Sequence, residues 1–335
     1  MASLFGPRIL AFHRVAFPLA CLLLLATTIV NQSDAQQQSE QSKPETSRPT
    51  LQRRIEERLT ALEAKENAHS SNREVGYQWS RLGEDYSLAG EFGDAESAFN
   101  HAVEAFSKEP ENRDLYAGAL DELGALYRVY GRIPEAQNCR RKALALRKKL
   151  GDPLQLALSQ SHLAELDLIS KKYKEAFTGA DSAYRQMSGM ENAGNGDLLS
   201  ALLVRTYAKC RLRRHAECLS DAQQALALSR SVFAEDSLPV GAALVALSSA
   251  QLDNGSTQEA EASARQAWGI LNRGLASNDP RVIFAMSKDR DCLLALHRTE
   301  EARKIDAQVS AIDRQPAQPC VSCTVSVYGL READH

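Results

Sequence analysis

Apolar side chains recur at helical spacing along most of the chain. The pattern is clearest in residues 79–86 and 120–127. Each stretch begins with a tryptophan or leucine at i, has leucine at i+3 and glycine at i+4, and ends with tyrosine at i+7. Apolar residues at this spacing cover one face of an α-helix, and the glycine leaves a notch for a partner helix. A β-leaning stretch, VSCTVSVYG, occurs only near the C-terminus. The chain is therefore predicted to be all-α.

A second helical pattern follows these stretches and recurs six times. Segments such as FGDAESAF (92–99) and IPEAQNCR (133–140) align without gaps, and an acid recurs every 40–42 residues. The residue after each acid is small: Ala95, Ala136, Ala176, Cys218, Ala260 and Ala302. Seven residues later stand Ala102, Ala143, Ala183, Ala225, Ala267 and Val309. Because residues seven apart lie on one helical face, the pattern predicts closely packed helix pairs.

The segments between the predicted helices contain residues typical of turns and of helix starts. Gly90 and Gly131 each follow a tyrosine by four residues and suit the turn inside a helix pair. Asp152 and Pro153 combine an N-cap acid with a proline at the first helical position, as does the Asp-Pro at 279–280. Each unit is predicted to be a helix, a tight turn, a helix and a longer loop.

The pattern W-x2-L-G-x2-Y of residues 79–86, followed by F-x2-A-x3-F-x2-A over 92–102, resembles the tetratricopeptide repeat. The usual period of that repeat is 34, and the longer unit here is similar to the kinesin-light-chain type. The resemblance covers residues 74–312 and implies a right-handed α-α superhelix of about six helix pairs. Such a solenoid is expected to end in a polar capping unit.

Two units depart from the repeat pattern. Arg205 and Thr206 occupy the Leu-Gly positions of unit four, and Asp289 and Arg290 occupy them in unit six. The period holds in both units, but the register of the first helix there stays open.

The N-terminal segment predicts export. Residues 1–14 contain bases and no acid, residues 15–30 are uncharged, and small residues Ser33 and Ala35 follow. This is the pattern of a signal peptide over 1–35, which gives a mature chain starting at Gln36 and a periplasmic or secreted location. An uncleaved membrane anchor is the alternative, since sixteen apolar residues approach the length of a span.

The next segments are a linker and a helix. Residues 36–50 are polar, low in complexity and contain two prolines, which predicts a disordered linker. A narrow apolar stripe of Leu51, Ile55, Leu59 and Leu62 predicts a lead-in helix over 51–73. This helix packs either on the array or in a two-helix coiled coil.

The charge balance and the missing catalytic motifs exclude several classes of function. The chain has 40 bases against 43 acids, a net charge of −3, and no strong basic patch stands out, which argues against nucleic-acid binding. No H-E-x-x-H, Walker or G-x-S-x-G motif is present, and no histidine lies three or four residues from another. The recurring glutamates are in phase with the repeats and are interpreted as residues that favour a helix start. The chain is predicted to be no enzyme and to need no cofactor or metal.

The cysteines leave alternatives open. Cys210 and Cys218 are expected on adjacent helices and can pair only if their Cα atoms come within about 7 Å. The tail over 313–335 holds Cys320 and Cys323, for which a local disulfide is the default in an exported chain. A redox or metal-binding accessory role for these two is the alternative, although the scaffold of a thioredoxin-like site is absent.

The resemblance implies a protein or peptide partner that binds in a concave groove. The register of the first helices predicts the side chains that face this groove: Tyr77, Ser80, Glu84, Asp121, Arg128, Ser161, Glu165, Tyr207, Arg211, Ser249 and Asp253. This set lacks the basic clamp with which chaperone-binding members hold a terminal carboxylate. An exported scaffold or adaptor is the leading prediction, with an extended segment carrying one or two basic residues as ligand. A membrane-anchored structural subunit with an uncleaved leader is another alternative.

Overall fold

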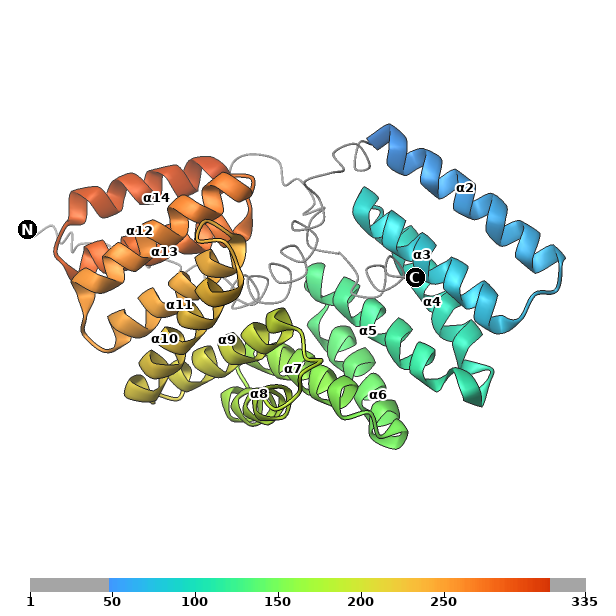
Figure 1. The fold of residues 1–335 in the computed structure, drawn as a ribbon. Helices are drawn as coiled ribbons and strands as arrows, with labels where there is room; N and C mark the ends of the chain where they lie inside the picture. The colour runs from blue at the N-terminus through green and yellow to red at the C-terminus, as the bar shows by residue number, and fades with distance from the viewer. Residues whose placement is uncertain (1–47, 314–335) are drawn as a thin grey trace, which may run out of the picture.

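A computed structural model describes residues 48–313, and this part of the chain is helical almost throughout (Figure 1). It contains thirteen α-helices and one 3-10 helix, with no strand in the described range. The elements are α2 (Arg48–Asn67), α3 (Asn72–Ala89), α4 (Phe92–Ser107), η1 (Pro110–Asn112), α5 (Arg113–Val129), α6 (Ile133–Leu150), α7 (Pro153–Ile169), α8 (Tyr173–Met187), α9 (Asn195–Arg211), α10 (His215–Val232), α11 (Leu238–Asp253), α12 (Thr257–Gly274), α13 (Pro280–Ala295) and α14 (Thr299–Asp313).

Twelve of these helices form six consecutive pairs, from α3 with α4 to α13 with α14, that follow one another along an arc (Figure 1). The two helices of each pair pack on each other, and the second helix of each of the first five pairs packs on the first helix of the next pair. The predicted superhelix of six helix pairs is confirmed. None of the helices between residues 48 and 313 combines the length and apolar character that a membrane crossing needs.

The lead-in segment forms α2, which packs along α3. Leu51, Ile55 and Leu62 of the predicted stripe are buried, whereas Leu59 is exposed. The helix ends at Asn67, before the predicted boundary at residue 73. Ser71 then caps α3 in a capping box with Glu74, which fixes the start of the first pair.

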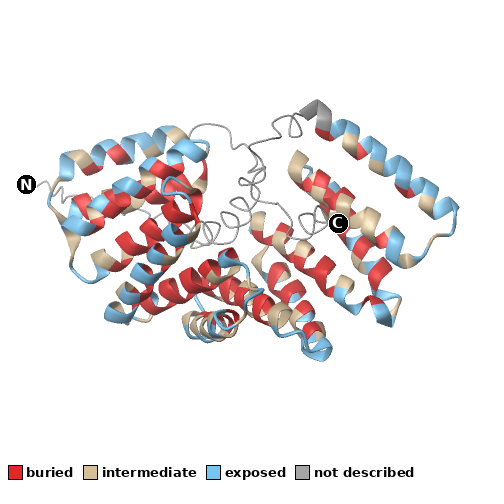
Figure 2. Cartoon of the chain, in the orientation of Figure 1, coloured by how far each residue is buried: buried red, intermediate tan, exposed pale blue. Residues whose placement is uncertain are grey.

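The recurring small residues lie where the helices of a pair meet. The first small residue of each second helix is almost completely buried, from Ala95 in α4 to Ala302 in α14. The glycine notches complete this packing, since a Cβ atom on Gly83 would come within 2.8 Å of the Phe99 ring. Buried positions accordingly form a continuous layer through the pairs (Figure 2). Small side chains allow this close approach.

The turn inside every pair has a residue in the left-handed backbone conformation. These residues are Gly90, Gly131, Lys171, Arg213, Gly255 and His297, with φ between 59° and 84°. Each lies seven positions after the notch residue of its first helix, and this includes Thr206 in unit four and Arg290 in unit six. The turns therefore place all six units in one register, including the two that the sequence left open.

Candidate functional site

A cleft of about 250 Å³ opens between α2, α3 and α5 at the N-terminal end of the array. Its lining combines apolar and charged side chains from four helices: Arg54, Arg58, Tyr77, Ser80, Arg81, Glu84, Asp85, Leu88, Phe106, Leu115, Gly118, Ala119 and Glu122. A hollow with an apolar interior and a few polar groups is the usual form of a binding site.

The wall from α3 follows from helical spacing. Tyr77, Ser80 and Glu84 are at i, i+3 and i+7, so they lie along one side of the helix and point into the same hollow. The Tyr77 ring packs edge-on against Phe106 of α4, with ring centroids 5.6 Å apart. Gly118 and Ala119 of α5 add little bulk to the opposite wall. The cleft therefore has an aromatic floor in which Tyr77 is partly exposed and Phe106 is buried.

The wall from α2 is fixed by two ion pairs. Arg54 and Arg58 lie one turn apart and reach the carboxylate of Asp85 in α3, at 2.6 Å and 2.5 Å. Asp85 itself is buried. Because a buried carboxylate is costly without a partner, these contacts hold α2 against α3. The sequence prediction missed both arginines, although their position beside the Leu51–Leu62 stripe could have indicated them.

Eight of the predicted groove residues fall into three groups. Tyr77, Ser80 and Glu84 line the cleft. Asp121, Arg128, Glu165 and Tyr207 are instead buried, and Arg211 is exposed at the end of α9 away from it.

The predicted charges of the groove need a correction. We expected Asp121 and Glu165 to be available to a ligand, with Arg128 as the one nearby cation. In the structure Arg140 and Arg147 of α6 both pair with Asp121, the first at 2.8 Å. Arg128 pairs with Glu165 at 3.4 Å. The prediction was wrong because it considered first helices alone, and the two missing cations come from a second helix.

His162 of α7 joins this buried network. A guanidinium nitrogen of Arg140 lies 2.9 Å from its Nδ1, and because arginine only donates, Nδ1 accepts. Burial, together with the charges of Arg140, Arg147 and Arg128, holds the pKa of His162 well below its usual 6.5. The ring is therefore neutral in the folded protein at neutral pH.

We expect an acid-dependent loss of stability from His162. Below pH 6.5 the unfolded chain binds a proton at this ring and the folded chain does not, so the free energy of unfolding falls as pH falls. The loss approaches about 1.4 kcal/mol per pH unit at most. Urea titrations of the parent and of His162→Gln between pH 7 and 5.5 measure it. An equal pH dependence in both proteins would contradict the assignment.

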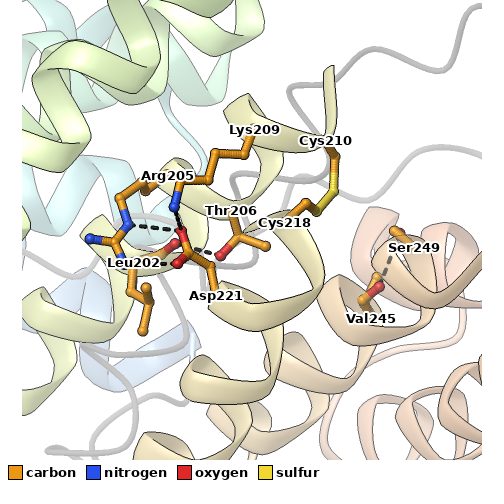
Figure 3. Close-up of a disulfide and its surroundings, with 9 residues drawn as sticks. All are labelled: Leu202, Arg205, Thr206, Lys209, Cys210, Cys218, Asp221, Val245 and Ser249. Atoms are coloured by element: carbon orange, nitrogen blue, oxygen red, sulfur yellow. Dashed lines mark hydrogen bonds and ion pairs between the residues drawn. A yellow bond between two sulfur atoms is a disulfide. The ribbon is translucent and has the colours of Figure 1, made fainter. Parts of the chain in front are cut away.

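The two irregular units replace apolar contacts with ion pairs. Arg205 binds Asp221 of α10 through two hydrogen bonds of 2.8 Å and 2.9 Å, and Lys209 approaches the same carboxylate at 2.8 Å (Figure 3). In unit six Asp289 pairs with Arg265 of the preceding unit at 3.4 Å. In these two units, charged side chains at the Leu-Gly positions thus hold neighbouring helices together by ion pairs, where units one and two use apolar contacts.

Cys210 and Cys218 form a disulfide across the turn of unit four (Figure 3). Their Cα atoms are 5.2 Å apart, within the distance that the sequence argument required. Cys218 occupies the small-residue position of its helix and is completely buried. Cys139 and Cys292 are buried free thiols, whereas Cys320 and Cys323 lie outside the described residues. Within residues 48–313 no cluster of three or more His, Cys, Asp or Glu side chains could hold a metal ion.

Comparison with known proteins agrees with this architecture. The sequence profile of the tetratricopeptide repeat matches residues 77–149, which span the first two helix pairs. Residues 77–149 are therefore tetratricopeptide repeats. The units of this chain, at 40–42 residues, are longer than the usual 34 residues of that repeat. None of the curated proteins compared with it matches in sequence.

Solved structures share the fold of this repeat protein at low identity. BtubC (BKLC) from P. vanneervenii superposes with a TM-score of 0.56 at 20% identity, over 66% of this chain and 90% of its own. NprR in complex with its cognate peptide NprX gives 0.57 at 14%, over 77% and 73%. A Rap protein complexed with Competence and Sporulation Factor gives 0.53 at 13%, over 88% and 98%.

Proposed function

We propose that this repeat protein is an exported, non-catalytic scaffold that binds a polypeptide segment in the cleft between α2, α3 and α5. The cleft carries the proposal, because it combines an aromatic floor of Tyr77 and Phe106 with charged groups at its rim. Tyrosine in such a place offers a large apolar surface and a polar end, and it is enriched among residues that dominate binding energy.

The similar structures support a peptide as ligand. NprR was solved with its cognate peptide, and a Rap protein was solved with Competence and Sporulation Factor. Charged side chains of both signs line the cleft, three arginines and three acids: Arg54, Arg58, Arg81, Glu84, Asp85 and Glu122. We infer that the preferred segment carries an apolar side chain for the aromatic floor, next to charged groups that pair with this mixed rim. Its affinity is expected to fall as salt rises.

Replacing Tyr77 with alanine tests the cleft. A panel of peptides that vary one apolar and one basic position, measured by fluorescence anisotropy, first identifies a ligand of the full chain. Tyr77→Ala is then expected to weaken that ligand at least ten-fold, since truncation of a central aromatic anchor commonly costs about 2 kcal/mol.

Tyr130 provides the matched control. It is an exposed tyrosine that packs on Phe92, outside the residues of the cleft. Tyr130→Ala should leave the affinity unchanged, and circular dichroism should show the same helical content in both variants. Equal affinities in the parent and in Tyr77→Ala would place the binding surface elsewhere.

Export is supported by the leader-like pattern of residues 1–35 and by the disulfide of unit four. Stable disulfides form in oxidising compartments outside the cytosol. We expect the protein isolated from its native host to begin at Gln36 and to keep Cys210 and Cys218 linked. Intact-mass measurement gives the first residue of the chain. Alkylation with and without prior reduction shows whether Cys210 and Cys218 are linked. A chain that begins at Met1 and needs detergent for extraction would favour the anchored alternative.

A further inference from the structure

The C-terminal end of the chain contains a segment whose side chains match the cleft between α2, α3 and α5. Residues 327–334 have the sequence VYGLREAD, in which Tyr328 and Leu330 come before one base and two acids. Among residues 1–47 and 314–335, Tyr328 is the one aromatic residue with charges of both signs within eight positions. An aromatic anchor beside charged groups is the combination that we infer for the ligand of the cleft.

The cleft supplies the complementary groups. Tyr77 packs edge-on against Phe106, with ring centroids 5.6 Å apart. Leu88 and Leu115 extend the apolar surface. The arginines of the lining come from α2 and α3 and its acids from α3 and α5, so both signs of charge border this surface. A site of this kind binds apolar side chains in its interior and charged groups at its rim.

The bend of the array brings the start of the C-terminal segment toward the cleft. α14 lies across the open side of the arc from α2 (Figure 1). Only three residues separate the end of α13 at Ala295 from the start of α14 at Thr299, so the two helices run antiparallel. The chain therefore leaves α14 beside the start of α13, about 10 Å away from it.

The start of α13 in turn lies close to unit two. Arg281 is at this start, and Arg128 is near the end of α5. Burial lowers the pKa of Arg128, and the charge of Glu165 opposes this. The positive charges of Arg140 and Arg281 add to the lowering. Units six and two therefore come within electrostatic range, about 10 Å, across the concave side.

The chain after α14 is long enough to reach the cleft. Gly118 lines the cleft and precedes Arg128 by ten residues, which is about 15 Å along α5. The whole path, from the end of α14 past the start of α13 and along α5, is about 35 Å. The thirteen residues 314–326 span up to about 45 Å when extended, so residues 327–334 can lie in the cleft.

We propose that residues 327–334 bind in the cleft of their own chain, as an internal ligand that an external polypeptide must displace. Tyr328 and Leu330 contact the apolar surface around Tyr77. Arg331 pairs with acids of the rim, and the two acids of the segment pair with its arginines. The inference rests on the proposed binding role of the cleft and adds a means of regulating access to it.

Attachment to the same chain makes a weak contact effective. A segment tethered by a short linker is present at its site at about 1 mM. With a dissociation constant of about 0.1 mM as a free peptide, the segment fills the cleft about nine-tenths of the time and weakens an external ligand about ten-fold.

Substitution of the segment in the full chain tests this. In Tyr328→Ala with Leu330→Ala, the peptide ligand found by anisotropy should bind about ten-fold more tightly than in the parent. Pro319→Ala with Val321→Ala is the control, because it changes two residues of the same tail before the segment, and it should leave the affinity at the value of the parent. Equal affinities in the parent and in the Tyr328 and Leu330 variant overturn the proposal.

A synthetic peptide with the sequence of residues 327–334 tests the contact directly. It should bind the Tyr328→Ala and Leu330→Ala chain with a dissociation constant on the order of 0.1 mM, and Tyr77→Ala in that chain should weaken it at least about ten-fold. Tyr130→Ala should not. No binding of this peptide, or binding that Tyr77→Ala leaves unchanged, overturns the proposal.

The outcomes separate this inference from the proposed function. If an external peptide depends on Tyr77 but is indifferent to the Tyr328 and Leu330 substitutions, the binding role of the cleft stands and the internal ligand is wrong. If no external peptide binds either chain, the proposed function fails and this inference fails with it. Sedimentation should show a monomeric parent. A dimer that the same two substitutions dissociate would mean that the segment binds a second copy, which overturns the internal assignment.

Discussion

Replacing Asp221 with alanine is expected to lower the free energy of unfolding by about 3–5 kcal/mol, the largest effect that we predict for a single substitution. Asp221 is buried and accepts two hydrogen bonds from Arg205, at 2.8 Å and 2.9 Å. Lys209 approaches the same carboxylate. Both cations are themselves buried, so removal of the acid leaves two poorly solvated positive charges. Their remaining acidic partners are more distant, Asp181 at 3.3 Å from Arg205 and Glu217 at 3.8 Å from Lys209.

Urea titration followed by circular dichroism measures this loss. Asp236→Ala is the matched control, since Asp236 is exposed in the loop before α11 and should change stability by less than about 0.5 kcal/mol. A second variant tests the mechanism. Arg205→Leu combined with Asp221→Ala restores the leucine of units one and two, and it should be less destabilised than Asp221→Ala alone. A greater loss in the double variant would mean that Arg205 contributes mainly through packing.

Replacing Ala136 with leucine is expected to cost about 1–3 kcal/mol. Ala136 lies in the contact between α5 and α6 and is completely buried. Its carbonyl oxygen would lie only 3.4 Å from a Cβ atom on Gly124, so the two backbones are already close. Three more heavy atoms have no space there without separating the helices.

Ala145→Leu provides the control on the same helix, because Ala145 is exposed. It should leave the urea midpoint almost unchanged, which excludes an effect of leucine on helix propensity. If Ala136→Leu unfolds at the same urea concentration as the parent, then Ala136 does not occupy the closest approach of the pair.

The two substitutions probe features that the sequence revealed to different extents. Ala136 was assigned to the helix contact from the repeat alone, because the small residue recurs at a fixed period. The role of Asp221 was not foreseen, since an acid three residues after Cys218 has no counterpart in units one and two. Arg205 marked only a departure from the pattern, and the structure shows its partner.

The cleft was predicted in the same partial way. Tyr77, Ser80 and Glu84 followed from the register of one helix, because side chains at this spacing share a face. Phe106 and Leu115 belong to other helices, and their position depends on how α4 and α5 pack. Asp121 and Glu165 satisfied the same spacing rule and are nonetheless buried in ion pairs.

The sequence by itself determined the helices, their period and the turns of units one and two, because these depend on residues within one or two helical turns of each other. The left-handed turns at Lys171 and Arg213 were decided by the tertiary structure, since the packing of a pair imposes on them a conformation that glycine adopts more easily. The tertiary structure also decided which charged side chains form pairs. Arg205 and Asp221 are 16 residues apart, and Arg140 reaches His162 across 22. Such contacts depend on the angle at which neighbouring helices cross, which no local pattern records.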